Sequence, residues 1–406
     1  MPNKKALKIV QINTVPNGST GTIMMSIHKQ LTKDGYDSYV VWGRGRKAEN
    51  DHEIYMNDKL GVYFHAIYSR LTGKTGFASK RATRKLLKKL DKIKPDVIHL
   101  HNLHGYYINI KLLFNYIKKN NIKTVWTLHD CWAFTGHCAY FESIRCQCWK
   151  GEKCKNIKAY PKSFVNTSKW NYAKKNQLIG GINELTIITP SNWLRTLVRK
   201  SFLSNRKCIV INNGIDITKF YINKELRSKF RNKYNLNNKV VILGVAYPWT
   251  EHKGLYDFYE LANHIDDSKY KIVLVGIKKD QADAVPKNIL HLEKTKDTTE
   301  LLEIYNGSDI FYNPTRGDNY PTVNIEATSC GLPIIVNKVG GAHEISKYND
   351  RVVAIRPDLS IDKLIELIDK ITNNSKRTNK NEDISIEKMV KEYELVYIEG
   401  TRKWKY

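Results

Sequence analysis

Hydrophobic and polar positions along the chain form two successive series of short apolar runs, each run followed by a longer segment. In the first half, runs such as ALKIVQIN and ELTIIT precede segments with apolar residues at helical spacing. Strands that alternate with helices predict βαβ units and a parallel sheet covered by helices. In this half we expect strands at 6–13, 37–43, 95–102, 122–130 and 184–191. We expect helices after the Gly-containing turn of 14–31 and at 79–92, 110–120 and 191–202, and the stretch KCIVINNGID at 207–216 closes this half.

A second series of the same kind follows a polar, lysine-rich stretch at 206–240, which we expect to be a linker region. One architecture used twice predicts two doubly wound α/β domains with a cleft for a nucleotide ligand. We place the domains at 1–205 and 206–384 and expect the C-terminal segment 385–406 to pack back toward the first domain. The second series predicts strands at 239–247, 270–276, 288–292, 309–314 and 333–338, and helices at 253–265, 297–306, 323–330, 359–373 and 385–399.

Positive charge is concentrated in the first half of the chain. Residues 1–210 contain 37 Lys and Arg against 12 Asp and Glu, whereas residues 211–406 contain 30 against 28. The first half should therefore attract an anionic membrane face, and the helix at 79–92 should lie against lipid headgroups unless it is a solvated face. No nucleic-acid recognition module is present, so we expect no nucleic acid partner. The basic residues of this helix are Lys80, Arg81, Arg84, Lys85, Lys88, Lys89 and Lys92.

The 406 residues contain no apolar run near the ~18 residues that a membrane helix needs. The N-terminal stretch MPNKKALKIVQIN runs from lysines into a strand and lacks the long apolar segment of a signal peptide. We therefore expect a cytoplasmic protein, peripheral at the inner face of the membrane.

The stretch RGDNYPTVNIEATSCG carries two acids, Asp318 and Glu326, on either side of an expected helix start. Carboxylates accept hydrogen bonds from paired sugar hydroxyls, so one acid could hold a ribose and the other a hexose. Lys253 precedes a glycine at another strand end, where an ammonium and a helix dipole both favour a diphosphate. The alternatives are two surface acids and a solvated lysine.

Three further strand ends carry candidate residues. NGSTG, with Gly18, lies between a strand and a helix, where glycines let the backbone approach an anion, although a plain tight turn is equally compatible. His129 and Asp130 end the strand TVWTL; the histidine could donate to a sugar hydroxyl or be a hydrogen-bonded loop residue. GGAHE, with Gly340, allows a tight turn after the strand PIIVNK.

Five of the seven cysteines fall within residues 131–154 of an expected Cys-rich insertion at about 131–160. Clustered cysteines in a cytoplasmic chain indicate a metal site or packing more often than disulfides. Four sulfurs could close a structural zinc site that stiffens this insertion; the alternative is free or transiently oxidised thiols. The four are Cys138, Cys146, Cys148 and Cys154.

Taken in order, NGSTG, TLHDCWAFTGHCAYF, ITPSNWL, VINNGID, EHKGL, NPTRGDNYPTVNIEATSCGLPIIV and GGAHE resemble the family 4 retaining glycosyltransferases of the GT-B fold. The pieces run over nearly the whole chain. Their sequences are most similar to those of the bacterial capsule, exopolysaccharide and colanic-acid-type transferases.

The resemblance implies transfer of a sugar, with retention of configuration and no catalytic metal or other required cofactor. A nucleoside-diphosphate sugar, with UDP favoured by the family, would bind mainly the C-terminal domain. A saccharide acceptor, often lipid-linked, would bind the N-terminal domain. The resemblance assigns catalytic positions to His129, Lys253, Asp318 and Glu326, and donor contacts to Gly18, Lys253, Arg316, Asp318, Asn319, Tyr320, Pro321, Thr322 and Glu326.

In one respect the chain departs from the family. Many members carry a second diphosphate-binding arginine after the strand that reads VILG here, whereas this chain has Val245 and Ala246. Arg316 and His252 are the candidate replacements. The alternative functions are a nucleotide-sugar 2-epimerase or another GT-B enzyme, and a non-catalytic basic binding protein.

Overall fold

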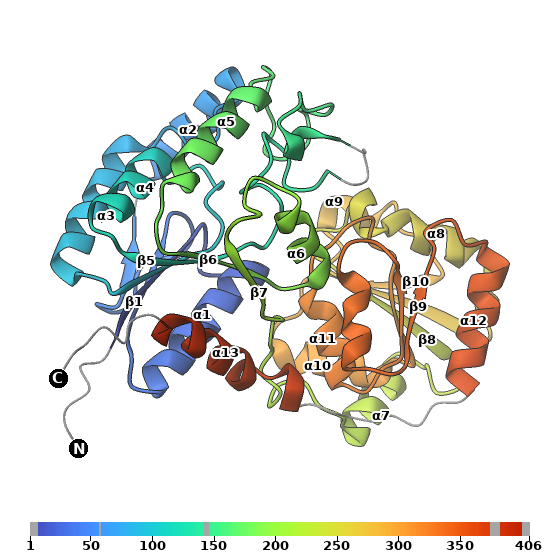
Figure 1. Ribbon diagram of the computed structural model, residues 1–406. Helices are drawn as coiled ribbons and strands as arrows, with labels where there is room; N and C mark the ends of the chain where they lie inside the picture. The colour runs from blue at the N-terminus through green and yellow to red at the C-terminus, as the bar shows by residue number, and fades with distance from the viewer. Residues whose placement is uncertain (1–6, 57, 142–145, 374–381, 400–406) are drawn as a thin grey trace. The chain divides into compact units, whose positions relative to one another are not determined.

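The computed structural model describes residues 7–56, 58–141, 146–373 and 382–399. Contacts divide the chain into a first unit, residues 1–212 with 389–406, and a second unit, residues 213–388. Each unit is built on one parallel sheet (Figure 1).

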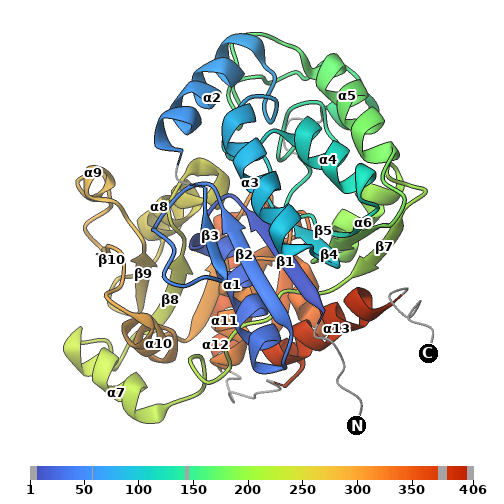
Figure 2. The same ribbon diagram turned by 90° about the vertical axis from the view of Figure 1, so that its left-hand side faces the viewer.

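The first unit has a seven-stranded sheet in the order β3-β2-β1-β4-β5-β6-β7. All pairs are parallel, and the order reverses direction between β1 and β4, which defines the switch point of a doubly wound fold. Helices α1 and α13 lie on one face, and α2 to α5 lie on the other (Figures 1 and 2). Its strands are β1 Lys8–Asn13, β2 Asp37–Trp42, β3 Glu53–Tyr55, β4 Val97–Leu100, β5 Lys123–Thr127, β6 Leu185–Thr189 and β7 Lys207–Val210; its helices are α1 Gly18–Lys33, α2 Lys59–Thr72, α3 Lys80–Ile93, α4 Ile110–Lys119, α5 Ser168–Gly180, α6 Asn192–Arg199 and, from Met389 on, α13 Ile386–Ile398.

The second unit has a six-stranded parallel sheet in the order β10-β9-β8-β11-β12-β13, with its switch point between β8 and β11. Its strands are β8 Val240–Val245, β9 Tyr270–Val275, β10 Ile289–Leu292, β11 Ile310–Asn313, β12 Ile334–Asn337 and β13 Val352–Ile355. Its helices are α7 Lys224–Lys233, α8 Leu255–His264, α9 Lys279–Ala282, α10 Thr298–Gly307, α11 Thr322–Ser329 and α12 Ile361–Asn373.

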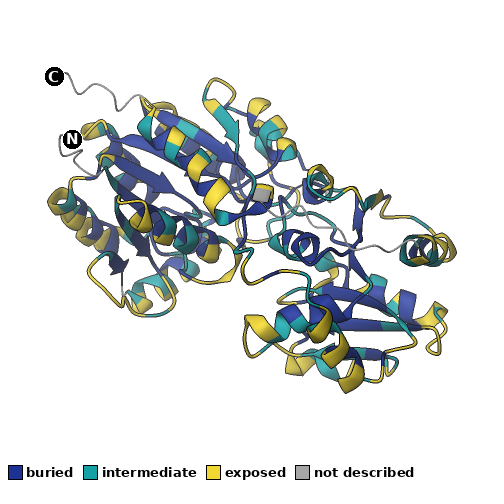
Figure 3. Cartoon of the chain, turned by 90° about the horizontal axis from the view of Figure 1, so that it is seen from below, coloured by how far each residue is buried: buried dark blue, intermediate teal, exposed yellow. Residues whose placement is uncertain are grey.

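Both faces of this second sheet are buried. Val241 and Leu243 of β8 pack into one apolar cluster with residues of α10 and α11, whereas Ile242 between them packs into another with α8 and α12. A strand buried on both faces needs apolar residues at consecutive positions, which explains the continuous run VVIL. Figure 3 shows the same pattern in each unit, with buried strands and with exposed residues on the outer sides of the helices.

The prediction of a linker at 206–240 is wrong. β7 pairs with β6, so the first sheet extends past the predicted domain boundary at 205. α7 follows, with Asn223 as its N-cap and Phe230 buried. Only Leu226 and Phe230 are apolar in this helix, because Arg227 and Arg231 bind Asp309 at 2.6 and 3.0 Å and so provide contacts that an apolar pattern does not reveal.

The end of α13 packs on the first sheet through polar contacts as well as apolar ones. The Tyr393 hydroxyl lies 2.9 Å from Thr127 Oγ1, and the Tyr397 hydroxyl lies 2.8 Å from His99 Nδ1. Lys123 Nζ donates to the carbonyls of Val396, Tyr397 and Glu399, and so caps the C-terminus of the helix. Residues 400–406 of the predicted C-terminal segment lie outside the described residues.

No helix in the described ranges has the length and the apolar character needed to cross a membrane.

The contact between Tyr397 and His99 predicts that Tyr397→Phe destabilises the protein. The substitution leaves a fully buried ring nitrogen of His99 without its partner, which costs about 1–3 kcal/mol. We expect a lower midpoint in urea unfolding monitored by circular dichroism. Tyr256→Phe, at an exposed position of α8, is the control and should leave the midpoint unchanged. Equal midpoints for the two variants would contradict this account of α13.

Candidate active site

Lys253 and Asp318 lie together at the carboxyl edge of the second sheet. Their Nζ and Oδ2 atoms are 2.6 Å apart. Lys253 lies in a short 3-10 helix (Glu251–Lys253) after β8, where Thr250 Oγ1 accepts from the Lys253 amide, and Asp318 lies in the loop after β11. These strands are the two at the switch point, so the predicted diphosphate lysine and the predicted sugar-binding acid lie where this fold class binds ligands.

The loop after β12 fixes the backbone of Asp318. Gly340 has φ +56°, and a Cβ at this position would overlap the Asp318 carbonyl oxygen. The amide of Gly341 donates to that same oxygen at 3.0 Å. The GGAHE turn therefore requires a glycine because of this close approach, and it positions the neighbouring acid.

Arg316 and His252 flank this ion pair. Burial lowers the pKa of the His252 imidazole below its usual value, although its hydrogen bond to the Gly317 carbonyl at 2.7 Å raises it. His252 is therefore neutral near pH 7, so of the two candidate replacements Arg316 is the one that carries a charge. Arg316 Nη2 binds Asp257 Oδ1 at 2.9 Å, and its buried Nη1 has no hydrogen-bond partner among the described residues.

Glu326 lies on α11 and is hydrogen-bonded to the hydroxyl of Tyr305, which donates to Oε2 at 2.8 Å. Burial raises the pKa of this carboxyl to about 7, and the bond from Tyr305 opposes the rise only in part. Glu326 thus differs from a solvated surface acid: it is half protonated near neutral pH.

The other predicted donor residues form the path from Asp318 into α11. Asn319 N donates to Asp318 Oδ1 at 2.8 Å, Pro321 is the N-cap of α11, and Thr322 is its first residue. Tyr320 is buried, and its carbonyl accepts from Asn213 Nδ2 at 3.0 Å.

Asn324 is a positioning residue that the sequence reasoning missed. Its Oδ1 accepts from Asn313 Nδ2 at 2.8 Å, and its Nδ2 donates to the Ala342 carbonyl at 2.9 Å. The side chain therefore ties α11 both to the end of β11 and to the GGAHE turn. An asparagine inside a short helix between two apolar residues was the available signal.

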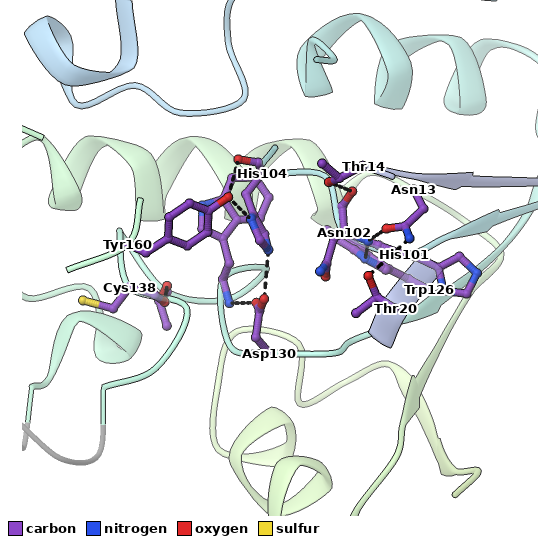
Figure 4. Close-up of polar contacts among 12 residues, drawn as sticks. Asn13, Thr14, Thr20, His101, Asn102, His104, Trp126, Asp130, Cys138 and Tyr160 are labelled. Carbon is purple, nitrogen blue, oxygen red and sulfur yellow. Dashed lines mark hydrogen bonds and ion pairs between the residues drawn. The ribbon is translucent and has the colours of Figure 1, made fainter. Parts of the chain in front are cut away.

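In the first unit, Gly18 lies at the N-terminus of α1 with φ +69°. The loop before it is tied to the end of β4: Asn13 Oδ1 accepts from the Asn102 amide at 3.2 Å, and Thr14 Oγ1 donates to the Asn102 carbonyl at 3.1 Å (Figure 4). These contacts place the free amides of a helix start at the switch point of the first sheet.

His129 lies in a buried group of histidines. Its Nε2 is 3.0 Å from His101 Nδ1, whose other nitrogen is 3.3 Å from Gln11 Oε1. Burial lowers the pKa of His129 to about 4, and burial together with the neighbouring histidines lowers the pKa of His101 well below its usual value. At neutral pH these rings are uncharged, and each has one donor and one acceptor nitrogen for hydrogen bonds.

A second polar group in this region was not predicted as a unit. His104 Nε2 lies 2.8 Å from Asp130 Oδ2, and His104 Nδ1 lies 3.2 Å from the Tyr160 hydroxyl (Figure 4). Burial would raise the pKa of Asp130, but the charge and hydrogen bond of His104 and the amide of Trp132 outweigh it, so the net shift is downward. His104 lies two residues beyond the predicted strand at 95–102, and no motif there distinguishes it from an ordinary loop histidine.

The cysteines that the sequence singled out also lie together. The Sγ atoms of Cys138, Cys148 and Cys154 are all within 4.8 Å of one another, and Cys146 Sγ is 3.9 Å from Cys154 Sγ. They lie between β5 and α5, in the first unit.

Each unit therefore presents polar groups at the carboxyl edge of a doubly wound sheet. In the second unit, Lys253 and Arg316 can stabilise a diphosphate, and Asp318 and Glu326 can accept hydrogen bonds from hydroxyls. In the first unit, neutral histidines and helix-start amides can bind sugar hydroxyls and phosphate oxygens. This arrangement suits transfer of a sugar from a nucleoside diphosphate.

Comparison with known families agrees with this geometry. Residues 20–219 match the family described as Glycosyltransferase Family 4, and residues 226–387 match Glycosyl transferases group 1. The two families together account for most of the chain and for both units. The protein is a glycosyltransferase of the GT-B fold, and the chain belongs to these two glycosyltransferase families.

Individual relatives are more distant. The chain is 26% identical over 365 residues to WcaC of Escherichia coli (strain K12), a provisionally assigned colanic acid biosynthesis glycosyl transferase, covering 84% of this chain and 85% of the relative. It is 29% identical over 174 residues to the N,N'-diacetylbacillosaminyl-diphospho-undecaprenol alpha-1,3-N-acetylgalactosaminyltransferase of Campylobacter jejuni subsp. jejuni serotype O:2, covering 40% of this chain and 44% of the relative.

Solved structures share the fold at low sequence identity. Sucrose-phosphate synthase from Thermosynechococcus elongatus matches with a TM-score of 0.70 and 13% identity, over 97% of this chain and 98% of that one. Anabaena HepE in complex with UDP and glucose matches with a TM-score of 0.64 and 14% identity, over 97% and 95%. These matches confirm the predicted fold class.

The raised pKa of Glu326 predicts a pH-dependent effect of Glu326→Gln on stability. A carboxyl whose pKa rises from 4.5 unfolded to about 7 folded favours folding while protonated, and it costs stability as the pH rises through that interval. The glutamine cannot ionise, so the variant should be more stable than the wild type at about pH 8, by at most roughly 3 kcal/mol, with little difference near pH 5.

Urea unfolding of both proteins at the two pH values measures this effect. A stability difference that is the same at both pH values would contradict the assignment of a raised pKa to Glu326.

Proposed function

We propose that this glycosyltransferase moves a sugar from a UDP-sugar to a lipid-linked saccharide in the synthesis of a bacterial surface polysaccharide such as a capsule or exopolysaccharide, with retention of anomeric configuration. The observation that carries the proposal is the pair of Lys253 and Asp318 at the switch point of the second sheet. The Lys253 ammonium can bind the diphosphate of such a donor, and the Asp318 carboxylate can bind the adjoining sugar.

The chemistry follows from the charges at this edge. As the sugar–phosphate bond breaks, negative charge builds up on the leaving diphosphate, and Lys253, with Arg316 beside it, stabilises that charge. The acceptor hydroxyl loses its proton to the leaving diphosphate as the new glycosidic bond forms. Neither Asp318, which is bound to an ammonium, nor the neutral His129 is required as the base; they orient the sugar.

In this proposal the Glu326 carboxylate accepts hydrogen bonds from the ribose hydroxyls of the donor. Its carboxyl is held on the rigid helix α11 by Tyr305, and a partly desolvated carboxylate accepts hydrogen bonds from a diol more strongly than a solvated one. UDP is proposed as the carrier because Anabaena HepE, which shares the fold, is described in complex with UDP and with UDP-glucose.

A lipid-linked acceptor is supported by the surface of the first unit. The name of the Campylobacter jejuni relative gives its acceptor as a diphospho-undecaprenol-linked sugar. In this chain, the seven basic residues of α3 named above are all exposed, and none forms an ion pair within the described ranges. Such a row of unpaired cations is suited to anionic lipid headgroups.

Helix α2 adds an apolar surface that the sequence reasoning did not identify. His65 on its opposite side binds Ser79 Oγ at 2.8 Å and so anchors α2 at the start of α3. An apolar row at helical spacing faces solvent on α2, and an exposed apolar patch beside a basic helix fits the interface of an anionic membrane. The row consists of Leu60, Tyr63, Phe64, Ile67 and Leu71.

We therefore propose that the protein is peripheral at the inner face of the cytoplasmic membrane, with α2 inserted between headgroups and α3 along them. The prediction of α3 as the contact helix is thereby extended to α2, which supplies the apolar contribution that α3 lacks.

Lys253→Ala tests the donor site. The variant should lose stabilisation by UDP, because the diphosphate loses its ammonium and meets Asp318 unpaired. The rate of UDP release from UDP-sugars should fall by about 10²–10³-fold.

Thermal unfolding with and without UDP, and the UDP-release rate, measure these losses. Lys363→Ala, which removes an exposed lysine of α12, should change neither. Undiminished stabilisation by UDP in Lys253→Ala would remove the proposed site.

Leu60→Asp tests the membrane surface. Placing a carboxylate on the exposed face of α2 should weaken co-sedimentation with phosphatidylglycerol-containing vesicles by roughly 10–150-fold, since burial of a leucine contributes about 1.5–3 kcal/mol. Leu395→Asp is the matched control, because Leu60 and Leu395 are 74% and 72% exposed. Equal binding by the two variants would contradict the proposal. So would a loss of self-association in Leu60→Asp without a change in vesicle binding, since α2 would then contact a second copy.

A further inference from the structure

The segment between β5 and α5 brings four cysteine side chains to one point. Cys138, Cys146, Cys148 and Cys154 are almost fully buried, at 0, 1, 0 and 4% exposure. The Sγ atoms of Cys138 and Cys154 are 3.0 Å apart, and those of Cys146 and Cys154 are 3.9 Å apart. All four cysteines are free of disulfide bonds in the structure.

These separations fit a shared cation better than a disulfide. Ligands held tetrahedrally at a Zn–S distance of about 2.3 Å lie about 3.8 Å from one another. A disulfide requires a separation near 2.05 Å and would involve only two of the four sulfurs. The sulfurs of Cys138, Cys148 and Cys154 thus converge to within 4.8 Å of one another, and Cys146 Sγ, 3.9 Å from Cys154 Sγ, is near enough to be the fourth ligand of a tetrathiolate site.

The segment is held by apolar packing and by scattered hydrogen bonds, with almost no regular secondary structure. Its described residues contain one short 3-10 helix, Cys148–Lys150, and no strand. The chain returns on itself through isolated backbone contacts, such as Gly136 N to the Cys148 carbonyl at 3.0 Å and Cys146 N to the Phe141 carbonyl at 3.2 Å. A central cation would join the parts of a segment that regular secondary structure does not join.

Two neighbouring groups suit negative charge on the sulfurs. The backbone amide of Lys155 points at Cys146 Sγ at 3.4 Å, a contact that favours a thiolate as acceptor. The ammonium of Lys175 is fully buried; it donates to the Trp132 carbonyl at 2.5 Å and lies 4.1 Å from the Trp132 ring. No carboxylate lies within ion-pair distance of Lys175 among the described residues, and its charge interacts with Cys148 most strongly, then with Asp130 and Cys138.

A buried lysine with no carboxylate in direct contact is costly unless a nearby anion offsets its charge. Four thiolates around one divalent cation carry a net charge of minus two, which supplies that anion.

We propose that Cys138, Cys146, Cys148 and Cys154 bind one Zn²⁺ as a structural tetrathiolate site, with Lys175 as the charge partner of the cluster. Binding releases the four thiol protons and leaves no open coordination position, so the ion takes no part in sugar transfer. The site fixes the segment that carries Tyr160 against His104.

Metal analysis of the purified full-length protein, expressed with zinc in the medium, tests the proposal. We expect one zinc per chain by mass spectrometry. Titration of the native protein with a mercurial reagent should release that zinc, as reported by a chromogenic chelator. Replacement by Co²⁺ should give the intense visible bands of a tetrahedral thiolate site.

Cys148→Ser and Cys154→Ser should each lower the zinc content. Cys131→Ser, which alters a buried cysteine of the same segment outside the four, should retain it. Because a ligand variant can fail to fold, the measurements on the wild-type protein decide the matter. Absence of metal with seven titratable thiols, loss of two thiols to a disulfide, or iron in place of zinc would each overturn the proposal.

Discussion

The ion pair between Lys253 and Asp318 is the interaction on which the donor site depends. Both side chains come from loops at the switch point of one parallel sheet, and the turn at Gly340 fixes the backbone of the acid by a contact that admits no side chain. The fold thus holds an ammonium and a carboxylate side by side on backbone segments that are fixed at this edge. Such preorganisation is how a site stabilises developing charge without reorganising during the reaction.

Protonation states separate the groups that carry charge from those that only form hydrogen bonds. Burial keeps His129 and His101 neutral and holds Glu326 near its midpoint at pH 7, whereas Arg316 remains a cation beside the pair. Two cations, Lys253 and Arg316, therefore lie at the edge where a diphosphate would leave, each paired with a carboxylate. A desolvated acid such as Glu326 costs stability at neutral pH, which is the pattern expected of a residue that serves a site rather than the fold.

The sequence was sufficient to predict the two sheets and the edges at which Lys253, Asp318 and Glu326 lie, because parallel strands that are buried on both faces consist of continuous apolar residues. It could not reveal α7, whose arginines bind Asp309 instead of presenting an apolar stripe, nor α2, whose apolar stripe faces solvent instead of a core. It also gave no sign of the His104–Asp130–Tyr160 group. That group depends on residue 160 returning to residue 104 across an irregular segment, and hydrophobic periodicity carries no information about such contacts.

The most direct test of the central claim is a crystal structure of the protein with an intact UDP-sugar bound. The account predicts that Lys253 Nζ lies within hydrogen-bond distance of a diphosphate oxygen, with Asp318 turned to a hydroxyl of the sugar and Glu326 to the ribose. A bound donor that leaves the Lys253–Asp318 pair closed, with its diphosphate held by other residues, would contradict the account.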